Sequence, residues 1–337
     1  MTLANPTLVE LTRADAVESE HRGRAVVMRS TGETIWSIGD TDRLTYPRSA
    51  IKAFQALPMV ASGAPKAFGL DDIDLALTCA SHEGEARHTE KVIEFLTKLG
   101  LSLTDLECGY HWPMGERATV DLAWSHHRPD ARHNNCSGKH AGMLALARQE
   151  EWDHHGYSKA DHPVQQAIRV CIERCCDTDL VHAPVSPDGC TAPTWAMPLH
   201  RLALGFARFA DPHRLPTEFL EPAQALYSAA TRNPFYVAGT GRYCTRMMMA
   251  LNGRAFLKVG AEGVYIAALP EWKLGIALKM DSGSALAAEV AMSEILHRLG
   301  LPISPEERQP AIRNRNRIVT GEIRAVGSAF ADIPNPD

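Results

Sequence analysis

Short apolar runs separated by turn residues occur at both ends of the chain and predict β-strands. Gly260, Gly263 and the Pro270-Glu271 pair predict tight turns between the last three runs, which favours an antiparallel arrangement. The predicted strands cover residues 7–13, 23–29, 34–38, 255–259, 264–269 and 273–278.

The middle of the chain has helical spacing of its apolar residues. Pro163 begins one helix, and Gly100 ends another whose apolar face carries Val92, Leu96 and Leu99. Further stripes begin at Leu199 and, after the second set of strands, at Ala288. The element order is therefore strands, a helical block, strands and a helix.

This order predicts an α/β (α+β) fold, in which N- and C-terminal strands form one antiparallel sheet with an inserted helical lobe. We expect one interleaved catalytic domain over 1–337, with an α/β lobe of about 1–48 plus 210–337 and a helical lobe of about 49–209. A cleft between sheet and lobe is the expected place for chemistry.

Composition narrows the class of protein. Of 337 residues, 45% are hydrophobic and 22% charged, which excludes a disordered or fibrous chain. The net charge of -5 argues against nucleic acid or an anionic membrane as partner. The first ten residues have no signal-peptide pattern and no run is long enough to span a membrane, so we expect a cytoplasmic protein with reduced cysteines.

Two serine–lysine arrangements are candidates for nucleophilic catalysis. Pro47 favours a helix start that places Ser49 in the first turn and Lys52 one turn on, where a lysine of lowered pKa can act as a base. Ser81 lies in a polar cluster after small residues, and Lys258 leaves a strand into a Gly-rich turn. Taken alone, Ser81 and Lys258 are more simply a turn serine and an edge lysine.

A dense motif, Asn134-Asn-Cys-Ser-Gly-Lys-His-Ala-Gly142, leads into another helix. Cys136, Lys139 and His140 fall on one helix face, and Cys190 follows on a tight turn beside Asp188. Two thiolates and a helix residue are ligand types that zinc accepts. The residues alone favour His140 over Lys139 as the ligand, and they leave open a catalytic Cys–His pair or buried inert thiols.

The remaining cysteines have less chemical context. Cys171, Cys175 and Cys176 follow an apolar helical stripe and are expected in the core, while Cys79 and Cys108 lack polar neighbours in sequence. Cys244 follows Gly239-Thr-Gly-Arg-Tyr, and its role stays open.

The order Ser49-x-x-Lys52, Ser81 and Lys258-Val-Gly260 resembles the three motifs of serine β-lactamases and penicillin-binding proteins. The terminal strands and inserted helical lobe are similar as well. Ser81 is followed by His-Glu rather than by x-Asn, however, so hydrolysis of β-lactams is not implied.

Five motifs together resemble the thermolabile-type L-asparaginases of rhizobia, of the Rhizobium etli kind, which share the serine β-lactamase and glutaminase fold. They are Val17-Glu-Ser-Glu-His-Arg-Gly23, Tyr46-Pro-Arg-Ser-Ala-Ile-Lys52, Ala80-Ser-His-Glu-Gly-Glu85, Asn135-Cys-Ser-Gly-Lys-His140 and Lys258-Val-Gly-Ala-Glu-Gly263. The resemblance implies a homodimer that hydrolyses L-asparagine to L-aspartate and ammonia, with a zinc ion near the active site.

The resemblance also implies a role for each matching residue. Two Ser–Lys pairs are Ser49 with Lys52 and Ser81 with Lys258. The implied zinc ligands are Cys136, Lys139 and Cys190, and the residues that orient the substrate or lie nearby are Arg48, His140, Asp188 and Cys244.

On this basis we expect Ser49 to attack the side-chain amide with Lys52 as base, and Ser81 with Lys258 to pass a proton to ammonia. The alternatives are a related serine amidase, acting on glutamine or a β-lactam, and a non-enzymatic metal or amino-acid sensor. All four Ser–Lys residues are present, which disfavours the sensor.

Overall fold

The computed structural model describes residues 4–336 of the chain. Contacts between residues divide it into two units. The sheet unit comprises the chain up to Ala50, Met197–Asp211 and the chain from Leu257, and the helical unit comprises Ile51–Ala196 and Pro212–Phe256.

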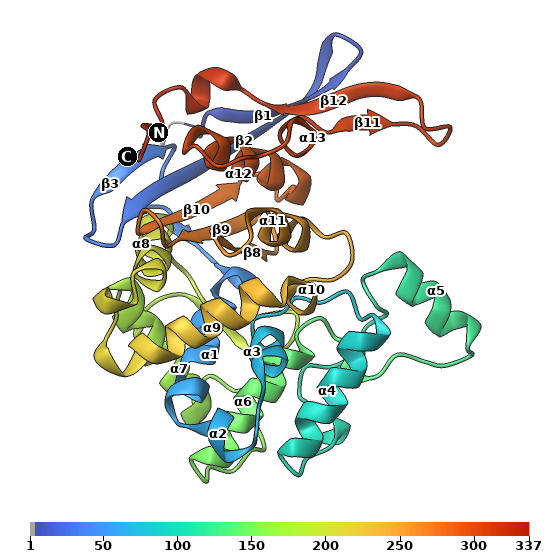
Figure 1. Ribbon diagram of the computed structural model, residues 1–337, viewed down its shortest axis with the longest axis vertical. Coiled ribbons are helices and arrows are strands. Elements are labelled where there is room, and N and C mark those ends of the chain that lie inside the picture. Colours follow the sequence, from blue (N-terminus) through green and yellow to red (C-terminus); the bar gives the residue numbers. More distant parts are fainter. Residues whose placement is uncertain (1–3, 337) are drawn as a thin grey trace. The chain divides into compact units, whose positions relative to one another are not determined.

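The sheet unit contains one antiparallel sheet of eight strands in the order β11-β12-β1-β2-β10-β9-β8, with β3 also paired to β2 (Figure 1). This sheet confirms the prediction that strands from the two ends of the chain form one antiparallel sheet. Two short strands, β4 (Leu44–Thr45) and β7 (Met197–Pro198), pair separately. The sheet strands are β1 (Thr7–Arg13), β2 (Ala16–Arg29), β3 (Thr34–Ile38), β8 (Phe256–Gly260), β9 (Val264–Leu269), β10 (Leu274–Met280), β11 (Ala311–Arg313) and β12 (Val319–Ala325).

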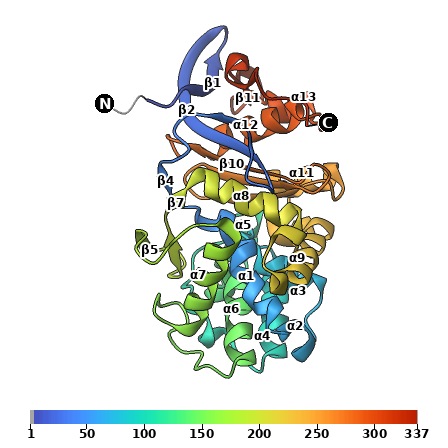
Figure 2. The same cartoon turned by 90° about the vertical axis from the view of Figure 1, so that its left-hand side faces the viewer.

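Strand β2 joins the two halves of this sheet. Its first residues pair with β1, and from Gly23 onward it pairs with β10 on one side and β3 on the other. The buried run Ala25–Met28 therefore lies at the centre of the sheet. Helices α8 (Leu199–Ala210) and α12 (Ala285–Arg298) cover its faces (Figures 1 and 2).

Helix α8 approaches the sheet closely because β10 has a glycine beneath it. A Cβ atom on Gly275 would lie 2.1 Å from the carbonyl oxygen of Ala203. This packing assigns α8 to the sheet unit and Pro212–Phe256 to the helical unit, whereas the sequence analysis divides the chain at 48–49 and 209–210. That the two units act as one catalytic domain stays a prediction.

The helical unit is built around α1 (Lys52–Ala61), which packs against α6, α7 and α9 (Figure 2). The hairpin of β5 (Val185–Pro187) and β6 (Pro193–Trp195) belongs to the same unit. Its other longer helices are α3 (Asp72–Thr78), α4 (Ala86–Lys98), α5 (Glu116–Trp124), α6 (Ser137–Gln149), α7 (Pro163–Cys176), α9 (Leu220–Arg232) and α11 (Tyr243–Leu251).

The remaining elements are short. In the helical unit they are α2 (Ala64–Ala67), α10 (Pro234–Val237), and the 3-10 turns Leu103–Asp105, Ala131–His133, Pro212–Arg214 and Thr217–Phe219. In the sheet unit they are α13 (Pro305–Arg308) and the turn Gly327–Phe330. A further 3-10 turn, Arg48–Ile51, crosses from one unit into the other.

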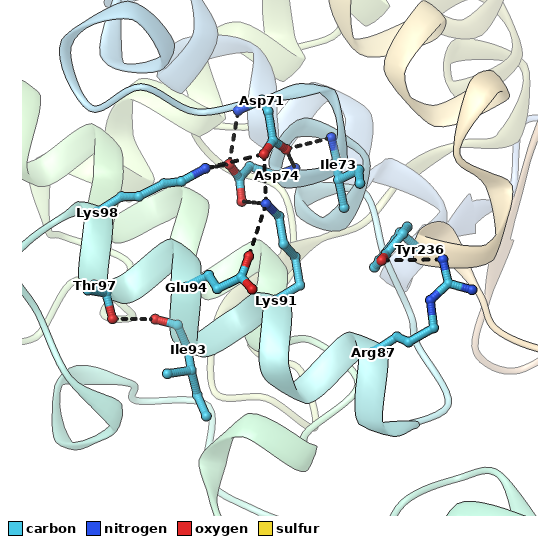
Figure 3. Close-up of polar contacts among 10 residues, drawn as sticks. All are labelled: Asp71, Ile73, Asp74, Arg87, Lys91, Ile93, Glu94, Thr97, Lys98 and Tyr236. Atoms are coloured by element: carbon cyan, nitrogen blue, oxygen red, sulfur yellow. Dashed lines mark hydrogen bonds and ion pairs between the residues drawn. The ribbon is translucent and has the colours of Figure 1, made fainter.

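A charged cluster fastens α3 to α4 (Figure 3). Asp71 caps α3 through the backbone N–H groups of Ile73 and Asp74, and Lys91 from α4 donates to Asp71 Oδ2 at 2.8 Å. Lys98 donates to the buried carboxylate of Asp74 at 2.5 Å. Burial opposes ionisation of Asp71, but the hydrogen bonds from Lys91 and the Asp74 backbone, together with the charges of Lys91 and Lys98, outweigh it and hold the Asp71 pKa below its usual value.

Candidate active site

Lys52 is the first residue of α1 and is completely buried. Its Nζ donates to Ser81 Oγ at 3.0 Å, to Cys136 Sγ at 3.1 Å and to the carbonyl oxygen of Ala80. The turn after α3 supplies Ala80 and Ser81, and the start of α6 supplies Cys136. Lys52 therefore connects its own motif with the Ser81 motif and the Cys136 motif.

The close approach of α6 to α3 depends on two glycines. A Cβ on Gly138 would lie 2.3 Å from the carbonyl oxygen of Leu77, and one on Gly142 would lie 2.9 Å from Thr78 Cγ2. Any larger residue would push the helices apart. The glycines of the Asn134–Gly142 motif therefore bring its polar residues beside Ser81.

Cys136 and Cys190 approach each other at the start of α6. Cys136 caps that helix, and the Asp188–Ala192 turn of the β5–β6 hairpin presents Cys190. A hydrogen bond between the two sulfurs lowers the pKa of Cys190 to about 4 and raises that of Cys136 to about 12. Cys190 is therefore the thiol of the pair that loses its proton first.

Lys139 completes this group. Its Nζ donates to Cys190 Sγ at 3.0 Å. Burial opposes its charge, but the combined effect of Cys190, Cys136 and Asp188 outweighs burial and raises the Lys139 pKa. Two convergent thiols suit zinc, and the amine could join them once the ion displaces its proton, so the residues present fit the implied metal.

His140 lies on the same helix turn but takes part in a different chain of contacts. Its Nδ1 is 2.7 Å from the hydroxyl of Tyr157, which accepts a hydrogen bond from the Glu107 backbone N–H at 2.9 Å. Burial lowers the His140 pKa to about 3, so the ring is neutral. The Tyr157 hydroxyl then donates to Nδ1 and leaves the proton on Nε2, which is buried without a hydrogen-bond partner.

Sequence reasoning missed Tyr157, Glu107 and His82. The Glu107 carboxylate accepts from the N–H groups of Gly156 and Ser158 and so anchors the Tyr157 segment. His82 Nε2 lies 2.9 Å from Ser137 Oγ, which ties the Ser81 turn to α6. No sequence pattern distinguishes these residues, and only their long-range contacts in the structure identify them.

The other predicted residues of the helical unit lie nearby or in its core. Asp188 begins the turn that carries Cys190 and acts electrostatically on Lys139. Cys244 is buried on α11. Cys108, to which the sequence analysis gives no chemical role, lies within electrostatic range of Cys136 and Cys190, and burial raises its pKa to about 12.

Arg48, Ser49 and Lys258 belong to the sheet unit. Arg48 and Ser49 lie in the 3-10 turn before α1, so α1 begins at Lys52, five residues after the start predicted at Pro47. Arg48 has a φ of 52°, a strained conformation for a residue other than glycine. Lys258, on β8, is buried and donates to the carbonyl oxygen of Val259 at 2.9 Å.

Gly260 brings β8 against the turn that carries Ser49. A Cβ at this position would lie 2.5 Å from the carbonyl oxygen of Pro47 and 3.3 Å from Ala50 Cβ. Gly260 is the last residue of β8 and directly precedes the predicted turn, which covers residues 261–263, and its lack of a side chain also permits the close packing.

One cavity, with a volume of about 690 Å³, lies within the helical unit. Glu83, Glu85, Arg117 and His133 are among its lining residues, but Lys52, Ser81 and Cys136 are not. This cavity therefore does not contain the buried lysine and its partners. In the described part of the chain, no helix is long and apolar enough to cross a membrane.

Comparison with known proteins identifies the class of enzyme and the family. The model described as L-asparaginase II matches residues 9–329, and the chain belongs to this family of amidohydrolases. Comparison with curated protein sequences gives no match. A solved structure, a β-lactamase from Mycobacterium bovis, is 14% identical with a TM-score of 0.41 and covers 82% of this chain and 94% of its own.

Proposed function

We propose that this enzyme hydrolyses L-asparagine to L-aspartate and ammonia through a serine nucleophile and a lysine base. Membership of the L-asparaginase II family supports the reaction. The observation that carries the mechanism is the contact of buried Lys52 Nζ with Ser81 Oγ at 3.0 Å, which supports proton exchange between this lysine and a serine hydroxyl, while the pairing of Lys52 with Ser49 rests on the motif resemblance. A lysine held in this way can take or return a serine proton once its amine is neutral.

In the proposed sequence, Ser49 Oγ attacks the side-chain amide carbon of asparagine while Lys52 takes the hydroxyl proton. The tetrahedral oxyanion needs fixed hydrogen-bond donors, each worth roughly 10²–10³ in kcat. Ser81, supported by Lys258, passes a proton to the departing nitrogen, and ammonia leaves. Water then cleaves the acyl-enzyme and releases aspartate.

Zinc belongs to the same proposal. Cys136, Lys139 and Cys190 would hold it, and the contacts among their side chains support this donor set. When bound, the ion supplies a positive charge that polarises and orients substrate oxygen. His140 would offer its Nε2 proton to the substrate, and Asp188 and Arg48 would help to orient it.

Two experiments test these proposals. Ammonia release from asparagine, glutamine and a chromogenic β-lactam separates an asparaginase from the related amidases, and no turnover of any substrate would favour a sensor. Ser49→Ala should abolish both turnover and the acyl-enzyme burst, whereas Ser37→Ala, an exposed serine of β3, should leave them unchanged. Full activity of Ser49→Ala would exclude Ser49 as nucleophile.

Removal of zinc tests the role of the metal. Because the proposed nucleophile is a serine, chelation should raise KM for asparagine more than it lowers kcat, and added zinc should restore KM. Loss of kcat at unchanged KM would contradict a role in orientation.

We also propose that the enzyme is a homodimer. Tyr110, Trp112 and Trp124 expose 71%, 47% and 82% of their surface on the segment around α5, which supports self-association as a homodimer. Light scattering of the purified enzyme would test it. We also propose a cytoplasmic location, in which the thiols stay reduced.

A further inference from the structure

Two positively charged side chains lie directly opposite each other on neighbouring strands of the sheet unit. Arg24 on β2 and Lys279 on β10 are direct partners in the antiparallel register. Arg24 is only 3% exposed, and Lys279 is half-buried. Like charges directly opposite each other on neighbouring strands destabilise a sheet, so this pair needs compensation.

The protein itself compensates only part of this charge. Arg24 donates to Asp281 Oδ1 at 3.2 Å and to Thr45 Oγ1 at 2.8 Å, but its buried Nε has no hydrogen-bond partner. Lys279 Nζ donates to two backbone carbonyl oxygens. Burial lowers the pKa of both groups, which shows that their charged forms are poorly solvated.

A cavity of about 460 Å³ opens on these two residues, and every lining residue belongs to the sheet unit. Four cationic side chains line it against two carboxylates, an excess of two positive charges. Asp281 is already bonded to Asn5 as well as to Arg24, which limits what it can offer the other cations. The lining residues are Arg24, Arg43, Leu44, Thr45, Tyr46, Arg48, Glu262, Lys279 and Asp281.

We propose that this cavity binds a small dianion, either phosphate or a short dicarboxylate, between Arg24, Arg43 and Lys279. Guanidinium groups match oxyanions in both charge and geometry, and a dianion would neutralise the excess charge. The ligand would also contact Arg48, the residue directly before Ser49. The site shares Arg48 with the residues proposed to orient the substrate, but binding of a dianion there does not require the proposed catalytic steps.

Binding of inorganic phosphate to the full-length protein tests the proposal without an activity assay. Calorimetry and thermal unfolding should show saturable binding and a rise in Tm, relative to sodium chloride of the same ionic strength. Arg43 is exposed and outside the sheet strands, so Arg43→Gln should fold normally and bind phosphate about tenfold more weakly. Arg315→Gln, an exposed arginine that does not line the cavity, should bind as the wild type does.

A second variant separates a binding site from a structural cluster. Lys279→Gln removes the cross-strand repulsion, so it should raise the Tm of the phosphate-free protein and reduce the stabilisation by phosphate. Succinate should compete with phosphate if dicarboxylates are the ligand, and failure to compete would assign the site to phosphate. Equal phosphate binding by wild type and Arg43→Gln, no saturation beyond the chloride control, or displacement by asparagine would overturn the proposal.

Discussion

At the scale of single residues, the hydroxyl of Tyr157 fixes the position of a proton on His140. It accepts from the Glu107 N–H and donates to His140 Nδ1, and the imidazole is left with a buried Nε2 proton that no protein group accepts. The ring is therefore prepared to donate one hydrogen bond in a fixed direction.

Tyr157→Phe should keep the ring packing but release this constraint. We expect KM for asparagine to rise roughly tenfold with a smaller effect on kcat, by analogy with lost contacts behind a metal site. Nitrogen NMR of His140 should show a mixture of tautomers. Tyr227→Phe is the matched control, because it also removes one hydrogen bond between a tyrosine hydroxyl and the backbone. In the wild type, the Tyr227 hydroxyl donates to the carbonyl oxygen of Gly253 at 2.9 Å. An unchanged KM and a single tautomer in Tyr157→Phe would contradict this role.

Single residues also show why the site was only partly predictable. The Ser49, Lys52, Ser81 and Cys136 motifs carry reactive groups at short spacings, and sequence patterns reveal such groups. Tyr157 and Glu107 lie 50 positions apart, and their hydrogen bond has no signature in the sequence. The proximity of Cys108 to Cys136 and Cys190 likewise has no signature in the sequence.

At the scale of elements, Gly138 controls the distance between α3 and α6. Gly138→Ala would place a methyl group against the Leu77 carbonyl and should destabilise the protein by about 1–3 kcal/mol. It should also lower asparaginase activity, because Ser81 follows α3 and Lys139 lies on α6. Gly327→Ala, where a Cβ meets nothing within 4 Å, should change neither Tm nor activity. A wild-type Tm for Gly138→Ala would show that the helices can move apart freely.

The cap of α3 gives a prediction for pH. The Asp71 pKa is lower in the folded protein than in the unfolded chain, so its contribution is present at neutral pH and disappears as the pH falls below the unfolded value of about 4. Asp71→Ala should lose about 0.5–2 kcal/mol from the cap at pH 7. Asp71→Asn keeps the capping oxygen and should lose mainly the acid dependence. Unfolding by denaturant between pH 3 and 7 would show whether the two variants differ in this way.

Some strands could be predicted from the sequence and others could not. β1, β3 and β9 have the predicted bounds because their apolar runs end at turn residues. β12 was missed, since Ile323 is its only buried residue and Gly321 interrupts its pattern. That glycine is required by long-range packing: a Cβ there would lie 1.9 Å from the Thr12 oxygen.

At the scale of the whole molecule, neither unit is a continuous segment of chain. The sheet unit is completed only by its last strands, since β12 pairs with β1 through Val9 with Ala325 and Leu11 with Ile323. Residues from the C-terminus therefore close one side of a sheet that begins at the N-terminus.

Deletion of residues 311–337 should leave β1 with an unpaired edge and uncover the core around Trp36, against which Phe330 stacks at 5.8 Å. We expect an aggregating protein, because a bare apolar edge strand recruits other chains. Deletion of 334–337 alone should remain monodisperse at wild-type Tm. Size-exclusion chromatography of both truncated chains checks this, and a well-behaved 311–337 deletion would contradict it.

The burial of all eight cysteines as free thiols has a practical consequence for labelling. Water-soluble alkylating reagents reach a buried thiol only when the structure around it opens, so the slow labelling rate of the native enzyme measures the free energy of local opening. A cysteine introduced at exposed Arg315 would react at once. A dye could therefore be attached there selectively, and the native thiols, which all lie in the helical unit, would report opening of that unit.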